Sequence, residues 1–146
     1  DLGMRPKEVV QAIQDASNSG PIVTLFTSMF LHGGPLHILM NMIFLVVFGR
    51  AVEDAIGSVR YAVYYLAWGI LASIAQIYVM PSSSVPILGA SGAIGGVLGA
   101  YFLLFPTSKI QIFIPVLLQS YKWSAWVLLG VWFLWQIAIP QEGVAN

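Results

Sequence analysis

Long apolar stretches separated by short polar breaks dominate the chain. From Tyr61 to Ser108 there is no Asp, Glu, Lys, Arg or His, and a stretch of that length accommodates two membrane-spanning helices of about 20 residues each. The breaks HGGP, PSSSVP and PTSK are rich in Gly, Pro and Ser, which start or end helices. The pattern predicts an all-α, polytopic transmembrane helix bundle with four spans, over residues 35–57, 60–80, 88–105 and 122–139.

The remaining segments are shorter. Residues 1–34 are expected to form an outer loop, in which residues 5–14 could make an amphipathic helix suited to the membrane interface. The segment IVTLFTSMF that follows is apolar but too short to span a bilayer. A second apolar segment, IQIFIPVLLQS, has an ambiguous pattern. No repeat divides the chain, so residues 1–146 are treated as one membrane domain.

The composition favours a membrane protein. Hydrophobic residues make up 58% of the chain and charged residues 8%, whereas soluble domains carry about a quarter charged residues. The alternative, a buried hairpin of a large soluble protein, lacks the elements that would cover it. The net charge of zero gives no basic face for nucleic acid. The absence of cysteine excludes disulfides, a thiol nucleophile and thiolate metal sites.

The distribution of Lys and Arg indicates the orientation of the spans, because these residues hold loops on the cytoplasmic side. Arg50 and Arg60 flank one connection, and Lys109 and Lys122 flank another. PSSSVP has neither, and it should face outward with HGGPLH and PQEGVAN. Arg5 and Lys7 are exceptions on the outer side. We expect a multi-pass protein of the plasma (inner) membrane.

Three polar residues then fall at one depth near the outer face. His37 lies in the first turn of its predicted helix, and Asn41 lies one turn deeper on the same side. Ser91 lies in the first turn or so of the third helix, so all three fall within about 10 Å of the boundary. They could simply bond one another across packed helices. Glycines four residues apart, Gly92 with Gly96 and Gly95 with Gly99, likewise indicate only close helix packing.

Two motifs give this polar set a second interpretation. GASG at 89–92, followed by a glycine-rich helix, resembles the G-x-S-G motif of the rhomboid intramembrane serine proteases, and HGGPLHILMNM resembles their H-x-x-x-N element. The segments FTSMFLHGG, FGRAVEDAIG and YYLAWGILASIAQ are also similar to the family. The resemblance covers essentially residues 2–146.

The resemblance implies a mechanism. Family members cut transmembrane helices of membrane-protein substrates near the outer membrane face, without metal or cofactor. Ser91 would be the nucleophile, and His37, Asn41 and the backbone N–H of Ser91 would stabilise the oxyanion. Gly89 would allow the tight backbone beside them, and Gly92 completes the motif. Because a helix hides its carbonyl groups, we expect small residues at the cleavage position and a weak helix beyond it.

The sequence departs from the family in lacking the catalytic base, which is a histidine on the last core span. The two histidines are His32 and His37; His37 matches the oxyanion element, and His32 is better explained by loop packing. We interpret the chain as four spans of a six-span core, favour truncation over a naturally shortened pseudoenzyme as the explanation, and expect the chain as given to lack hydrolytic activity.

Alternative functions remain at this point. A catalytically inactive rhomboid-like scaffold could bind membrane helices without cutting them. A channel or transporter is disfavoured because ionisable residues are missing from Tyr61 to Ser108. His32 and His37 make a poor metal site without a third ligand. Ser73 and Gln76 are expected to form bonds between helices.

Overall fold

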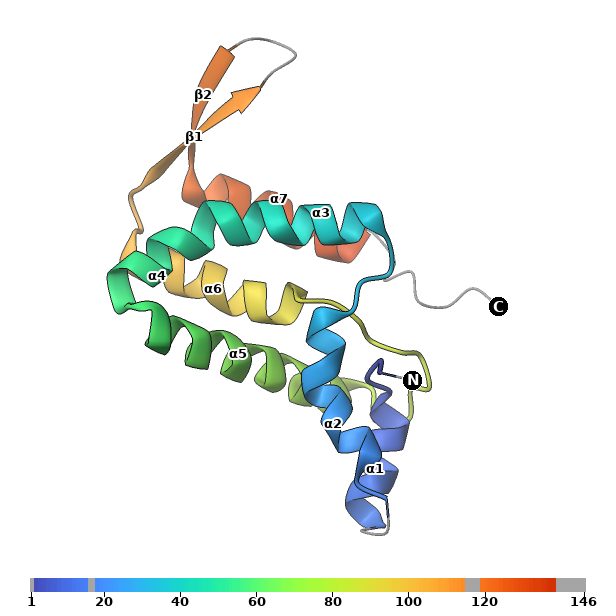
Figure 1. Ribbon diagram of the computed structural model, residues 1–146. Coiled ribbons are helices and arrows are strands. Elements are labelled where there is room, and N and C mark those ends of the chain that lie inside the picture. Colours follow the sequence, from blue (N-terminus) through green and yellow to red (C-terminus); the bar gives the residue numbers. More distant parts are fainter. Residues whose placement is uncertain (1, 16–17, 115–118, 139–146) are drawn as a thin grey trace.

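The structure, a computed structural model, describes residues 2–15, 18–114 and 119–138. It shows a bundle of helices from which one β-hairpin projects (Figure 1). In chain order the elements are α1 (Pro6–Gln14), α2 (Gly20–Thr27), the 3₁₀ turn η1 (Ser28–Phe30), α3 (Pro35–Phe44), the π-helical segment η2 (Leu45–Gly49), α4 (Arg50–Ile56), α5 (Ser58–Val79), α6 (Ser91–Leu104), β1 (Lys109–Ile114), β2 (Gln119–Ser124) and α7 (Ala125–Ala138). The predicted helical bundle is confirmed.

The first long helix is continuous through α3, η2 and α4, over Pro35–Ile56. Pro35 occupies its first turn, where the missing N–H of proline is harmless. Gly57 ends the helix with φ at +86°, a conformation that glycine adopts without strain. Because α5 begins at the next residue, α4 and α5 contact each other at this turn.

The third long helix begins three residues later than the sequence pattern indicated, at Ser91 instead of Leu88. Ile87 pairs with Met4 in an isolated antiparallel bridge, with hydrogen bonds of 3.2 and 2.8 Å between their backbones. Gly89 then turns the chain with φ at +115°. Residues held extended in this way cannot also start a helix, so Ser91 becomes the first helical residue.

The connector of ambiguous pattern is a β-hairpin. Strands β1 and β2 pair antiparallel with Lys109 opposite Ser124 and Ile114 opposite Gln119. The helix expected from Lys122 therefore begins at Ala125, because residues 119–124 belong to the sheet. Alternating polar and β-branched or aromatic residues favour a strand here. The expected end of that helix at 139 lies outside the described residues.

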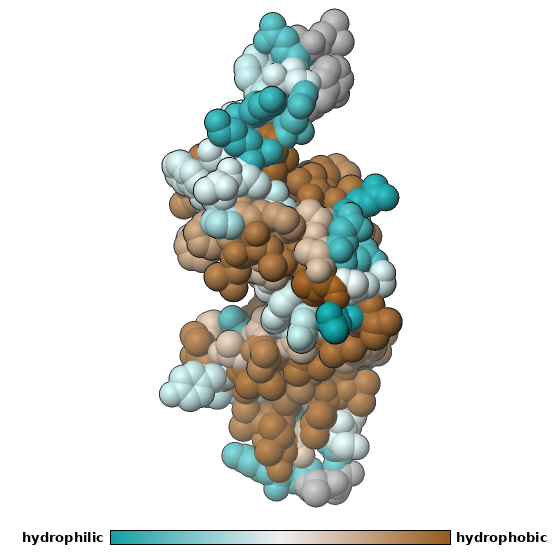
Figure 2. Space-filling view, turned by 90° about the vertical axis from the view of Figure 1, so that its left-hand side faces the viewer, coloured by the Kyte–Doolittle hydropathy of each residue, from teal (hydrophilic) through white to brown (hydrophobic). Residues whose placement is uncertain are grey.

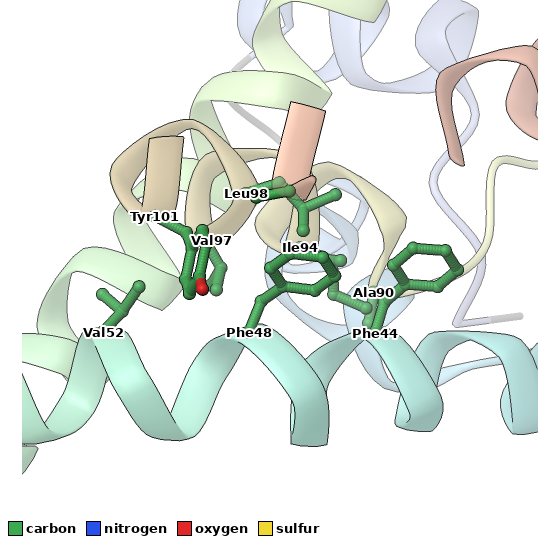
Figure 3. Packing of buried hydrophobic residues seen from close by; sticks show 9 residues of the cluster. Phe44, Phe48, Val52, Ala90, Ile94, Val97, Leu98 and Tyr101 are labelled. Atoms are coloured by element: carbon green, nitrogen blue, oxygen red, sulfur yellow. The ribbon is translucent and has the colours of Figure 1, made fainter. Parts of the chain in front are cut away.

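Helix α6 is the centre of the bundle, with α5 on one side and α3 and α7 on the other (Figure 1). Phe44, Phe48 and Val52 point from the long first helix onto α6, where they meet small and branched side chains (Figure 3). Phe48 contacts the ring of Tyr101 edge to face, with ring centroids 4.9 Å apart. The buried cluster consists of Phe44, Phe48, Val52, Ala90, Ile94, Val97, Leu98, Tyr101 and Ala125.

Glycine governs how closely α5 and α6 approach. A Cβ on Gly92 would lie 2.6 Å from Cβ of Ala72, and one on Gly96 would overlap the ring and Cβ of Trp68. The predicted close packing is therefore present for this pair. Of the second pair, a Cβ on Gly95 would lie 3.3 Å from Trp132, and Gly99 has nothing within 4 Å. Only one of the two glycine pairs forms a close helix interface.

The outside of the bundle is apolar. Among the described residues two helices, Pro35–Ile56 and Ser58–Val79, are long and apolar enough to cross a membrane, and only 6% of the apolar stretch of the second is buried. Apolar side chains cover much of the surface seen in Figure 2, well beyond the patches normal for soluble monomers. The exposed side chains on these helices include Leu36, Leu39, Ile43, Val46, Val63, Leu71 and Val79. This surface fits a lipid environment.

The N-terminal helices α1 and α2 lie at the end of the bundle where α3 and α6 begin (Figure 1). The short helix expected over residues 5–14 is present as α1. Its Val9 is fully buried, whereas Ile13 is exposed. The hydrogen bond from Lys7 N to Ser83 O, 3.0 Å, ties α1 to the loop before α6.

The glycine interface gives a matched test. Replacing Gly96 with Ala forces a methyl group into Trp68, and overpacking of this kind costs about 1–3 kcal/mol. Replacing Gly99 with Ala on the same helix meets open space and should stabilise the helix by up to about 1 kcal/mol. Thermal unfolding in detergent micelles measures both. Equal stabilisation by the two variants would contradict the close packing of α5 and α6.

Candidate active site

The predicted site residues lie at one end of the bundle, where α3 and α6 both begin (Figure 1). His37 is in the first turn of α3, Asn41 is one turn further along, and Ser91 is the first residue of α6. Gly89 lies between the two helices. A Cβ on Gly89 would be 2.8 Å from Cε1 of His37 and 3.8 Å from Nδ2 of Asn41. The structure thus brings His37 and Asn41 against the backbone that leads into Ser91.

The ring of His37 is held by its own loop. Its Nδ1 accepts a hydrogen bond from the backbone N–H of Gly33, 3.4 Å away. A neutral imidazole that accepts at Nδ1 carries its proton at Nε2. That nitrogen is 2.9 Å from the position that a Cβ on Gly89 would take. His37 therefore presents an N–H donor to the turn before Ser91.

Asn41 is a buried donor without an acceptor. Its side chain is 2% exposed, and Nδ2 has no hydrogen-bond partner among the described residues. Burying an amide N–H without a partner costs about 1–3 kcal/mol. A buried donor without a partner calls for an explanation, and a functional role is one of the recognised ones.

The turn at Gly89 is fixed from the opposite side by η1. The backbone N–H of Gly89 donates to the carbonyl oxygen of Ser28 at 2.9 Å. The φ of +115° lies in a region that residues with a Cβ rarely adopt. Both the space and the backbone angle at this position therefore require glycine.

A cavity of about 300 Å³ opens beside Ser91, between η1, α5 and the start of α6. Ser28, Ser73, Gln76 and Ser91 supply its polar lining. Gln76, which was expected to bond between helices, instead donates from Nε2 to Sδ of Met80 within its own chain segment, 3.5 Å away. The other lining residues are Met29, Gly69, Ala72, Ile87, Leu88, Gly89, Gly92 and Ala93.

The structure gives the positions of the remaining predicted site residues, whose roles stay predictions. Within the described part of the chain no hydrogen bond is recorded from Ser91 to His37 or Asn41. Gly92 lies against α5, so its visible contribution is helix packing. The His32 ring lies 5.3 Å from that of His37, edge to face, and its buried Nε2 has no partner among the described residues. No group of three possible metal ligands occurs in the described residues.

Sequence reasoning missed the residues that hold the turn in place. Ser28 acts through its backbone carbonyl, and Met4 acts through its bridge to Ile87. Backbone hydrogen bonds between distant segments cannot be predicted from the residue types involved, because every residue has a backbone carbonyl group. The only available signal was the segment FTSMF, which contains Ser28 and had been noted for its resemblance alone.

Comparison with known proteins identifies the family of the chain. The family model described as the rhomboid domain matches residues 19–146. The chain belongs to the rhomboid family. It is 31% identical over 115 residues to Rhomboid protein 1, mitochondrial, of Saccharomyces cerevisiae, covering 75% of this chain and 33% of that protein. It is 46% identical over 76 residues to Rhomboid protease GluP of Bacillus subtilis, covering 52% of this chain and 14% of the relative.

A plant protein is also similar to this chain. RHOMBOID-like protein 6, mitochondrial, of Arabidopsis thaliana is 40% identical over 77 residues, covering 52% of this chain and 24% of that protein. The chain therefore spans a third or less of the length of these three relatives. No solved structure matched the chain. The predicted family is confirmed, and with its apolar helices it makes this rhomboid chain a membrane protein of a family that includes serine proteases.

Gly57 and Gly89 both have positive φ, so replacing each with alanine distinguishes the effect of backbone strain from the effect of a steric clash. Gly89→Ala places a methyl group against His37 and strains the backbone, whereas Gly57→Ala has the backbone strain alone, because nothing lies within 4 Å of it. Strained angles of this kind cost about 1–3 kcal/mol. We expect both variants to lower the unfolding midpoint in detergent, and Gly89→Ala to lower it further. A smaller effect at Gly89 would contradict the contact with His37.

Proposed function

We propose that this chain carries the core of an intramembrane serine endopeptidase that cuts transmembrane helices of membrane proteins near the outer membrane face. The observation that carries the proposal is the buried Nδ2 of Asn41, which has no hydrogen-bond partner among the described residues and lies with His37 beside the turn that leads to Ser91. Family membership supports the same function, and one relative is named a rhomboid protease.

Ser91 is the proposed nucleophile. Its hydroxyl would attack the scissile carbonyl carbon, and the carbonyl oxygen would become an oxyanion. The first N–H groups of a helix have no partner within the helix, and the helix dipole favours negative charge there. Ser91 is the first residue of α6, so its backbone N–H joins His37 and Asn41 as the third proposed donor.

The serine also needs a base to accept its proton. His37 is proposed as an oxyanion donor, and His32 contacts His37 with no contact to Ser91 recorded in the described part of the chain. We therefore propose that the base is a histidine outside these 146 residues, in a longer protein of the size of the relatives. Without it, the chain as given should be inactive. The proposed chemistry needs neither metal nor cofactor.

The size of the cavity beside Ser91 indicates which substrate side chains could fit there. Its volume of about 300 Å³ and its many glycine and alanine positions give room for a small side chain and the adjoining backbone. A helix must unwind locally before its carbonyl group can be attacked. Substrates with small residues at the cut and helix-breaking residues beyond it are therefore proposed.

The location in the cell follows from charge. Ser91 lies at the end of the bundle opposite to Arg50 and Arg60, which favour the cytoplasmic side. We propose that the site faces the extracytoplasmic side of a plasma membrane, in a multi-pass arrangement. Two of the relatives carry the word mitochondrial in their names. In a mitochondrial inner membrane the same site would face the side away from the matrix.

The test uses the full-length protein that contains this chain, reconstituted in liposomes with a transmembrane substrate. Ser91→Ala should abolish both cleavage and labelling by a fluorophosphonate probe, whereas Ser84→Ala, exposed in the preceding loop, should change neither. His37→Ala and Asn41→Ala should each lower kcat by about 10²- to 10³-fold with little change in KM, because an oxyanion donor acts in the transition state.

The inactive scaffold makes the opposite prediction. It would bind membrane helices while the folded full-length protein resists the probe at Ser91. Thermal unfolding in detergent checks that each variant is folded. Unchanged cleavage by Ser91→Ala, or no labelling of the folded wild type, would overturn the protease proposal.

A further inference from the structure

The hairpin of β1 and β2 leaves the bundle at one end and contacts it mainly at its base (Figure 1). A two-stranded hairpin alone in water is marginally stable at best. Its outer edges also expose unpaired backbone groups, which usually need a cover. The hairpin therefore calls for a partner surface that the rest of the described chain does not supply.

The register divides the hairpin into two unlike faces. Ile110 is opposite Trp123, and Tyr121 lies two positions from Trp123 on the same face. The other face carries Lys109, Gln111 and Lys122, with Gln111 directly opposite Lys122, and the register assigns position 113 to this face as well. Tyr121, Trp123, Lys109, Gln111 and Lys122 are all exposed. One face carries Tyr121 and Trp123, and the opposite face carries both lysines.

The base of the hairpin is fixed to the helices. Ala125 N donates to Ser108 O at 3.1 Å, and the hydroxyls of Tyr101 and Ser108 are 2.9 Å apart. Ile110 packs against the buried cluster on α6. From this anchored base the strands run across the direction of the helices (Figure 1). If the helices cross a bilayer, the hairpin lies along its surface.

The charges of the hairpin are uncompensated. No Asp or Glu occurs from Lys109 to Ser124, and neither lysine forms an ion pair within the described residues. The part of the hairpin visible in Figure 2, looking onto this end of the bundle, is largely hydrophilic. The turn between α4 and α5 lies at the same end, and its Arg50 and Arg60 are balanced by Glu53 and Asp54, so the uncompensated positive charge there is that of the hairpin lysines. Positive charge with exposed Trp and Tyr is the composition of a membrane-interface element.

We propose that the hairpin is an interfacial anchor that lies on the leaflet at this end of the bundle, with Tyr121 and Trp123 among the lipid headgroups and Lys109 and Lys122 on anionic lipid phosphates. The aromatic face supplies apolar contact with a polar rim. The long stems of the lysines let their ammonium groups reach the phosphates from the opposite face. The partner is an anionic lipid surface.

Spin labels on the cysteine-free chain test the placement of the two faces. Tyr121→Cys and Gln111→Cys give one labelled site on each face. In nanodiscs of phosphatidylcholine with phosphatidylglycerol, the label at 121 should be more accessible to dissolved oxygen, and the label at 111 to a water-soluble nickel chelate. Equal access of the chelate to both sites would show a hairpin that projects into water. Protection of both sites from both reagents, with spin-spin broadening, would show contact with a second copy. Either result would overturn the proposal.

The lysines are tested by charge removal in the Tyr121→Cys background. Near an anionic surface each lysine contributes about fivefold to partition, so Lys109→Gln with Lys122→Gln should lower the ratio of docked to free hairpin about 25-fold. Lys7→Gln, at the other end of the bundle, is the matched control and should change nothing. The wild-type ratio should fall when phosphatidylglycerol is omitted or salt is raised. The proposal would be overturned if the ratio of docked to free hairpin stayed the same when phosphatidylglycerol was omitted and when both lysines were replaced. This outcome does not depend on whether the protein is an active protease.

Discussion

The close approach of α5 to α6 is the constraint on which the rest of the structure depends. Gly92 and Gly96 leave no space for side chains of their own, so Ala72 and Trp68 of α5 lie directly on the α6 backbone. This places the opposite side of α6, with Ile94 and Tyr101, against the first long helix. In a lipid environment there is little hydrophobic gain from helix association, so contact of this kind provides much of the stability. The start of α6, and with it Ser91, is positioned by the same contact.

The site combines a rigid backbone with unsatisfied polar groups. Ser28 and His37 hold Gly89 from two sides, and the chain cannot shift there without losing a hydrogen bond or meeting a ring. Next to this fixed turn the amide of Asn41 has no acceptor among the described residues. A donor that is already oriented needs little reorganisation when a negative charge develops beside it. The unpaired amide of Asn41 therefore lowers the stability of the folded protein at the place where the proposed chemistry occurs.

The sequence predicted the helices better than it predicted what joins them. The spacing of His37 and Asn41 sets both on one side of a helix, so their proximity could be inferred from periodicity and topology. The start of α6 could not, because it depends on Met4 pairing with Ile87, two residues far apart in the chain. The hairpin was missed because short apolar runs suit strands and helices alike. The support given by Ser28 involves only its carbonyl group, which every residue has.

The π-helical segment Leu45–Gly49 has a consequence for how the family can vary. Its wider turn lets Phe44, Phe48 and Val52, each four residues apart, all reach α6, although an ordinary α-helix drifts sideways at that spacing. The wide turn takes up one residue more than ordinary α-helical turns would, so the outer and inner halves of the helix keep the same phase. An insertion or deletion that is not absorbed by such a wide turn would rotate the outer half by about 100° relative to the inner half, and the donors at the outer end and the aromatic contacts at the inner end could then not both face α6. Length changes should therefore be tolerated in the surface loops but selected against within this one helix.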